Sequence, residues 1–190
     1  MTEEEVKDAL AEVGAILEGH FVLSSGRHSN IYAEKFRALE RPGLSVALGD
    51  ALARRLDGTR VDVVLAPAVG GIVLGFVTAL ALGARSIFAE REGGAMSLRR
   101  GFEIAPQERV LIVEDVITTG KSVKEVIDLV PRAQIVSVGC LVDRSSGTKL
   151  GVPLVSLCRL DAVSWAPDEC PLCAAGVPTD VRGSRHLASK

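Results

Sequence analysis

The sequence predicts an α/β fold, in which a mainly parallel, twisted sheet is flanked by helices. Short aliphatic and β-branched runs alternate with stretches of helical pattern, as successive βαβ units require. These runs are apolar throughout, which is typical of strands that are covered on both faces. The chain has 190 residues, of which 47% are hydrophobic. This supplies one sizeable core, so a single domain is expected over residues 1–190.

The chain is expected to begin with an amphipathic helix. Thr2 and Glu5 have the spacing of a capping box, and apolar residues recur at helical spacing from Val6 to Leu17. The polar, glycine-bearing stretch 20–32 then separates two short β-like runs.

Strand and helix patterns alternate in the middle of the chain. The expected strands cover residues 61–66, 86–90, 110–113, 135–142 and 154–160, and the expected helices cover 44–56, 72–82 and 122–130. The first of these strands runs into Pro67 and then Gly70-Gly71, which predicts a glycine turn. In sheets of this type, ligands bind beyond the carboxyl ends of the strands.

The stretch from residue 165 onward is rich in Pro, Gly and small residues and shows neither period. It is assigned no independent fold and is expected to wrap the surface or pack in a dimer. It contains Cys170-Pro-Leu-Cys173, the spacing of half a zinc ribbon or of a redox motif. No second pair follows and no histidine lies at ligand spacing, so a plain turn is favoured over a metal or disulfide role. Cys140 and Cys158 lie in apolar runs and are expected in the core.

Charge argues against several classes of partner. The 22 basic and 24 acidic residues give a net charge of −2, which provides no overall field for nucleic acid or for an anionic membrane. The acidic N-terminus lacks the order of a signal peptide, and Gly, Pro and charge interrupt the long apolar stretches. A cytoplasmic protein is expected, with neither nucleic acid nor membrane as partner.

The most informative segment, residues 113–122, reads Val-Glu-Asp-Val-Ile-Thr-Thr-Gly-Lys-Ser. An aliphatic strand delivers Glu114 and Asp115 into a loop of hydroxyl residues and glycine that opens a helix. The main-chain N–H groups of residues 118–122 suit a phosphate dianion. The two carboxylates suit ribose hydroxyls and a developing cationic sugar carbon. The plain alternative is a solvated acidic strand end before an ordinary capped helix. A nucleotide P-loop is excluded because Asp115 stands where its first glycine belongs, five residues before Gly120.

This segment is similar, position by position, to the phosphoribosyl pyrophosphate (PRPP) signature of type I phosphoribosyltransferases. The chain as a whole resembles the orotate phosphoribosyltransferases, and three further segments carry that resemblance: 21–32, 66–72 and 141–144. The resemblance implies a small N-terminal hood and base-binding segment at 1–40, an α/β core at 41–160 and a C-terminal tail at 161–190. The tail, with Gly183-Ser184-Arg185, resembles that of a bacterial and archaeal branch of the family.

The resemblance also implies roles for individual residues. PRPP would be bound by Glu114, Asp115, Val116, Ile117, Thr118, Thr119, Gly120, Lys121 and Ser122, together with Gly70, Gly71 and Arg91. Orotate would be bound by Thr118, Arg144, Ser25, Gly26 and Tyr32. In the loop that holds pyrophosphate, residues 66–72, an unusual peptide geometry is expected.

The catalytic loop departs from the family pattern. The family has an Arg-Lys pair, a further lysine and a histidine there, whereas residues 89–101 contain neither lysine nor histidine. Arg91 corresponds to the family arginine, and Arg99 and Arg100 are candidates for the remaining positive charge, with Glu114 and Asp115 as the other catalytic residues. The alternative for Arg99 and Arg100 is a solvated basic turn. The family's lysine before Ser-Gly is also replaced, by a serine.

The resemblance implies transfer of ribose 5-phosphate from PRPP to orotate in pyrimidine biosynthesis, by a homodimer. Mg²⁺ would be held mainly by substrate oxygens and water, without a protein metal cluster. Because orotate is already an anion, no strong general base is needed, and His20, His28 and His186 form no obvious catalytic pair. His28 is expected at the surface. The alternatives are a purine-type phosphoribosyltransferase, acting on xanthine or adenine, and a non-catalytic regulator that senses PRPP and binds nucleic acid.

Overall fold

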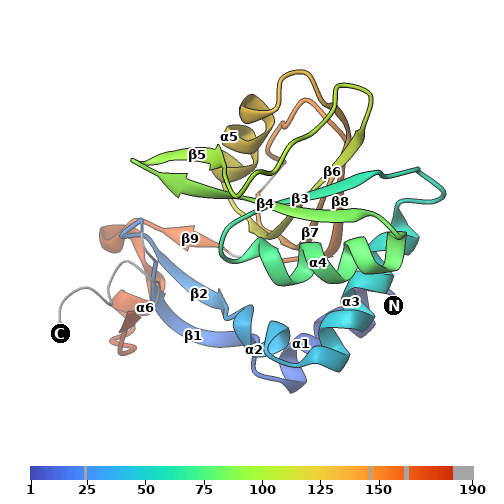
Figure 1. The fold of residues 1–190 in the computed structure, drawn as a ribbon. Helices are drawn as coiled ribbons and strands as arrows, with labels where there is room; N and C mark the ends of the chain where they lie inside the picture. Colours follow the sequence, from blue (N-terminus) through green and yellow to red (C-terminus); the bar gives the residue numbers. More distant parts are fainter. Residues whose placement is uncertain (24, 146, 161–162, 182–190) are drawn as a thin grey trace.

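Two sheets form the fold of the computed structural model, which describes residues 1–23, 25–145, 147–160 and 163–181 (Figure 1). The larger sheet has six strands in the order β5-β4-β3-β6-β7-β8. Their bounds are β3 Val63–Pro67, β4 Arg85–Glu92, β5 Ala95–Leu98, β6 Arg109–Ile117, β7 Gln134–Asp143 and β8 Leu154–Arg159. All neighbouring pairs are parallel except β4 and β5. The predicted mainly parallel sheet is therefore confirmed.

Helices cover both faces of the large sheet. α1 (Glu3–Glu12), α3 (Pro42–Arg55) and α4 (Gly71–Leu82) lie on one face, and α5 (Lys121–Leu129) lies on the other (Figure 1). Successive residues of β6 point to opposite faces, so Leu111 packs with the first group and Ile112 with α5. This two-sided burial explains why the strands read as continuous apolar runs.

The smaller sheet is built from both ends of the chain. Its order is β10-β1-β2-β9, with β1 Ile16–Val22, β2 His28–Ala33, β9 Ser164–Trp165 and β10 Asp180–Val181. β9 pairs with β2 and β10 pairs with β1, while η1 (Pro167–Glu169) and α6 (Pro171–Ala174) lie between them. The C-terminal stretch therefore completes the N-terminal sheet. Sequence periodicity missed this because each added strand is only two residues long.

Two other expectations differ from the structure. The first helix ends at Glu12, and Leu17 lies in β1, because Gly14 takes a left-handed conformation (φ 68°) that turns the chain. Residues 89–101, expected as a catalytic loop, instead form most of a β4–β5 hairpin that turns at Gly93 and Gly94. The small helix α2 (Phe36–Leu39) follows β2, and α3 then leads the chain to β3 of the large sheet.

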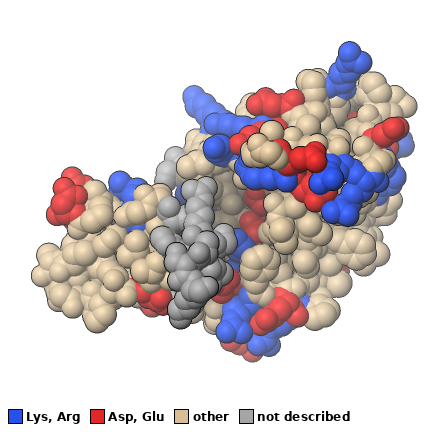
Figure 2. All heavy atoms as spheres, turned by 60° about the vertical axis from the view of Figure 1, so that its left-hand side comes forward, with Lys and Arg blue, Asp and Glu red and all other residues tan. Residues whose placement is uncertain are grey.

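Charges of both signs are mixed on the surface. On the face in Figure 2, Lys and Arg side chains lie beside Asp and Glu rather than in one continuous basic area. Among the described helices, none has the length and apolar character to cross a membrane.

Candidate functional site

The segment predicted to bind a sugar phosphate forms a hollow at the carboxyl end of β6. The hollow is lined by Glu114 and by residues 116–123, so it follows the turn from β6 into α5. Gly120 has φ 71° and is tightly packed: a Cβ there would lie 2.8 Å from Thr148 Cγ2. Glycine is thus required both by the backbone conformation and by the close contact. The N-terminus of α5, at Lys121, opens directly behind the turn.

The glycine turn after β3 lies directly against this hollow. A Cβ on Gly70 would lie only 1.8 Å from Asp115 Oδ2, and one on Gly71 would lie 2.7 Å from the Val113 carbonyl oxygen. The peptide bond between Ala68 and Val69 is cis, which confirms the expected unusual peptide geometry. The structure therefore packs the predicted pyrophosphate loop against the end of β6, from which the predicted phosphate turn continues.

Both acidic side chains at the end of β6 are buried, with 8% exposure for Glu114 and 5% for Asp115. Asp115 Oδ1 accepts a hydrogen bond from the Val116 N–H (2.6 Å), while Oδ2 accepts none from the described residues. Lys35 Nζ lies 3.3 Å from that Oδ2. Lys35 follows β2 and was not singled out from the sequence, where it stands in an ordinary charged stretch. Only the fold places it at the site.

Burial raises the pKa of the Glu114 carboxyl well above its ordinary value of 4.5. The negative charge of Asp115 raises it further, and the nearby Lys35 opposes the shift. The raised pKa means that, in the protein without ligand, it is unfavourable for Glu114 and Asp115 to be charged at the same time. A ligand that donates hydrogen bonds to the carboxylates relieves this cost.

Glu114→Gln is expected to raise the melting temperature of the free chain at pH 7, because the amide has no charge to bury. Glu114 begins to destabilise the folded protein as the pH rises above 4.5, where the unfolded chain ionises. The destabilisation reaches its full size above the raised pKa of the folded state. The gain from the substitution should therefore disappear below about pH 4. Thermal melts at both pH values measure it, with the exposed Glu103→Gln as control. A gain of equal size at both pH values would contradict the assigned cause.

Arg144 immediately follows β7, beside the end of β6, where its main-chain N–H donates to the Ile117 carbonyl (2.8 Å). Its side chain is half-buried, and the buried Nε has no hydrogen-bond partner among the described residues. Burial lowers the pKa of this guanidinium, and Tyr32 on β2 partly opposes the shift. The structure thus brings Arg144 and Tyr32 together from different sheets. Ser25 and Gly26 lie exposed in the turn between β1 and β2.

The three arginines of the β4–β5 hairpin are all exposed and paired. Arg91 donates to the Gly94 carbonyl (2.8 Å) and forms an ion pair with Glu125 of α5. Arg99 lies 3.6 Å from Glu92, and Arg100 lies 3.1 Å from Glu90. Arg91 is thereby linked to the helix behind the phosphate turn, whereas Arg99 and Arg100 pair with acids of their own hairpin.

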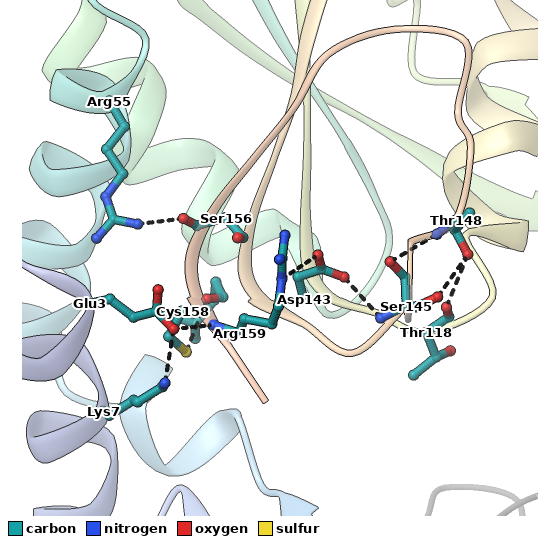
Figure 3. Close-up of polar contacts among 11 residues, drawn as sticks. Glu3, Lys7, Arg55, Thr118, Asp143, Ser145, Thr148, Ser156, Cys158 and Arg159 are labelled. Atoms are coloured by element: carbon teal, nitrogen blue, oxygen red, sulfur yellow. Dashed lines mark hydrogen bonds and ion pairs between the residues drawn. The ribbon is translucent and has the colours of Figure 1, made fainter. Parts of the chain in front are cut away.

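A chain of polar contacts supports the phosphate turn from the side of β8 (Figure 3). Thr148 Oγ1 donates to the Thr118 carbonyl (3.5 Å), and the Thr148 N–H donates to Ser145 Oγ (3.3 Å). Ser145 in turn donates its N–H to the buried Asp143 (2.8 Å), which also pairs with Arg159 (3.4 Å). No sequence pattern marks Thr148, because this contact crosses 30 residues of chain.

A second polar cluster lies in the small sheet, and it corrects two expectations. His20 and His28 form a hydrogen-bonded pair (2.8 Å) beside Cys170 and Cys173. The histidines lie near the cysteines although about 150 residues separate them in the chain. The lack of a histidine close to the cysteines in the sequence therefore did not exclude such a cluster. His28 is 7% exposed, not a surface residue. His186 and the Gly183-Ser184-Arg185 segment lie outside the described residues.

Comparison with known proteins gives consistent matches. Residues 38–167 match the family model for the phosphoribosyl transferase domain. The orotate phosphoribosyltransferase of Thermotoga maritima is 49% identical over 185 residues, covering 96% of this chain and 99% of the relative. That of Chlorobium phaeobacteroides is 47% identical over 188 residues, covering 97% of each.

Solved structures show the same similarity. The orotate phosphoribosyltransferase from Aeropyrum pernix superposes with a TM-score of 0.69 at 29% identity, covering 82% of this chain and 93% of the other. The adenine phosphoribosyltransferase from Rhodothermus marinus shares the fold, with a TM-score of 0.62 at 21% identity, covering 81% of this chain and 99% of the other.

Proposed function

Because this chain belongs to the phosphoribosyltransferases, and among them to the orotate phosphoribosyltransferase family, we propose that it transfers ribose 5-phosphate from PRPP to orotate. The products are orotidine 5'-phosphate and pyrophosphate, as pyrimidine nucleotide synthesis requires. The observation that carries the choice of base is Arg144, whose buried Nε has no partner among the described residues. A carboxylate on the base would satisfy it.

In this proposal the donor is held by the two turns that meet at Asp115. Residues 118–122 bind the 5-phosphate through main-chain N–H groups and hydroxyls, aided by the N-terminus of α5. Glu114 and Asp115 accept hydrogen bonds from the vicinal ribose hydroxyls. Val116 and Ile117 line the base of the turn. Gly70 and Gly71 let the loop after β3 pack closely on β6, because side chains there would clash with Asp115 and Val113. The main chain of this loop is the proposed contact for the pyrophosphate.

The chemical step breaks the bond between ribose C1 and the pyrophosphate oxygen, which leaves with the bonding electron pair. The orotate ring nitrogen then forms the new bond to C1 from the opposite face, and its proton passes to the leaving pyrophosphate or to water. Glu114 and Asp115 stabilise the positive charge that develops on the sugar, so that positioning and electrostatics account for catalysis. Lys35 Nζ, 3.3 Å from Asp115 Oδ2, places a positive charge beside the two carboxylates.

Arg91, Arg99 and Arg100 are the cations proposed to neutralise the leaving pyrophosphate. Arg91 forms an ion pair with Glu125 of α5, the helix behind the turn. Arg99 and Arg100 would have to exchange their partners Glu92 and Glu90 for phosphate oxygens. The proposed Mg²⁺ would share this task, held mostly by substrate oxygens and water.

For the base, the proposal places the orotate carboxylate on the Arg144 guanidinium. Tyr32 and the Ser25-Gly26 turn would enclose the ring from the small sheet, and Thr118 would contact both substrates. Residues 1–40 thus act as a hood and 41–160 as the core of a single domain that a tail, 161–190, completes. A cytoplasmic location belongs to the same proposal.

A homodimer is also proposed, and the outer surface of α4 supports it. Val73, Phe76 and Leu80 recur at helical spacing there, with exposures of 37%, 60% and 64%. A second copy of the chain would cover this apolar stripe. Light scattering gives the mass of the particle directly.

Incubation of the purified chain with PRPP, Mg²⁺ and one base at a time tests the proposed function. Orotate should release pyrophosphate at least about a hundredfold faster than adenine or xanthine, because neither purine carries a carboxylate for Arg144. Faster turnover of a purine would favour the purine-type enzyme. No turnover with any base would instead favour the PRPP-sensing regulator.

A further inference from the structure

Four metal-binding side chains converge in the small sheet, away from the residues proposed for catalysis. His20 comes from β1 and His28 from β2, while Cys170 lies between η1 and α6 and Cys173 lies in α6. One donor atom from each lies within 4.8 Å of every other. Three of the four residues are buried, with Cys173 at the exposed side.

The hydrogen bonds fix how His20 faces the cluster. Its Nδ1 lies 2.7 Å from the Val177 carbonyl oxygen, which accepts but cannot donate, so Nδ1 carries the proton. Nε2 therefore presents a lone pair to the other three residues. A histidine whose second nitrogen donates to a main-chain carbonyl is the usual arrangement of a metal ligand.

Hydrogen bonding alone satisfies this cluster poorly. The single lone pair of His20 Nε2 faces His28 Nδ1 at 2.8 Å, Cys170 Sγ at 3.4 Å and Cys173 Sγ at 3.7 Å. It can accept one good hydrogen bond, which leaves the other groups with weak thiol contacts. Cys173 Sγ also lies 3.3 Å from His28 Nδ1. Such mutual separations are close to those between the ligands of one tetrahedral ion, with bonds of about 2.0 Å to nitrogen and about 2.3 Å to sulfur.

We propose that His20 Nε2, His28 Nδ1, Cys170 Sγ and Cys173 Sγ bind a structural zinc ion. Two thiolates neutralise the dication, so no net charge is buried. A set of two sulfur and two nitrogen ligands favours zinc among the common metals. Because the protein supplies all four ligands, no position is left for substrate, and the site is not catalytic.

The ion would hold the C-terminal segment on the N-terminal sheet. It connects β1 and β2 at both sides of the turn 23–27 with the chain that leads from β9 to β10. Among the described residues, few other contacts do this: β9 and β10 each pair over two residues only, His20 donates to the Val177 carbonyl, and Arg27 donates to Ser164. Zinc would thereby fix the turn that carries Ser25 and Gly26.

Metal analysis of the full chain, produced in zinc-supplemented medium and dialysed, tests the proposal. About one zinc ion per chain is expected, and replacement by cobalt should give the intense visible absorption of tetrahedral cobalt with thiolate ligands. Cys173→Ser and His28→Gln should each lower the retained zinc at least about tenfold. Cys158→Ala, a cysteine buried in the core, is the matched control and should retain it.

Melting temperature provides the second measurement. A strong chelator should lower it in the wild type and in Cys158→Ala, and added zinc should restore it. A chain that takes up neither zinc nor cobalt, or that keeps full zinc in both variants, overturns the proposal. A Cys170–Cys173 disulfide found by mass spectrometry of the unreduced chain does the same. None of these measurements uses PRPP or orotate, so the outcome is independent of the proposed function.

Discussion

Replacing Asp115 with Asn is expected to lower turnover about a hundredfold or more, on the order of 3 kcal/mol of lost transition-state stabilisation. The substitution keeps the shape of the side chain and the acceptor for the Val116 N–H. It removes the negative charge that lies next to Lys35 and, in our proposal, next to the cationic sugar. Steady-state kinetics with PRPP and orotate measure the effect.

Stability separates a catalytic role of Asp115 from a structural one. The melting temperature of Asp115→Asn should stay within a few degrees of the wild type, while turnover falls. Asp128→Asn, an exposed position on α5, should change neither quantity. Unchanged turnover in Asp115→Asn would remove this residue from the chemistry.

Replacing Arg144 with Met is expected to lower kcat/KM for orotate about a hundredfold or more, again on the order of 3 kcal/mol. Methionine fills a similar space among half-buried neighbours but offers no donor to a carboxylate. KM for orotate should rise, and KM for PRPP should stay within about twofold, because the donor is bound by other residues. Substrate titrations at saturating levels of the second substrate measure both constants.

The matched control is Arg132→Met, an exposed arginine before the opposite end of β7. It should leave all constants unchanged. If Arg144→Met instead raised KM for both substrates equally, Arg144 would act on the site as a whole and the assignment to the base would be wrong.

The core of the fold was predictable because its strands are apolar on both faces. β3, β6 and β7 are recognisable in the sequence as β-branched runs. The turn after β6 is recognisable by its two acids, its hydroxyl residues and Gly120. The short strands β9 and β10 could not be predicted, since two residues show no period. They form by pairing with β2 and β1, which is a tertiary effect.

The part of the candidate site that is contiguous in the sequence was predicted. The residues that only the fold brings to it were missed. The close approach of Gly70 to Asp115 adds a packing reason for a glycine that the sequence marked as part of a turn and, by resemblance, of the PRPP site. Lys35 and Thr148 were missed because each meets the site across a long stretch of chain. The contact of His20 with Cys170 was missed for the same reason.

In our proposal, the turn after β6 binds the phosphate of a sugar whose diol lies on Glu114 and Asp115. Titration calorimetry of the wild-type chain with PRPP and Mg²⁺ tests it most directly, with ribose 5-phosphate as competitor because it shares that phosphate and diol. We expect saturable binding of PRPP, and we expect ribose 5-phosphate to displace it. Absence of binding, or binding that ribose 5-phosphate leaves unaffected, would contradict it.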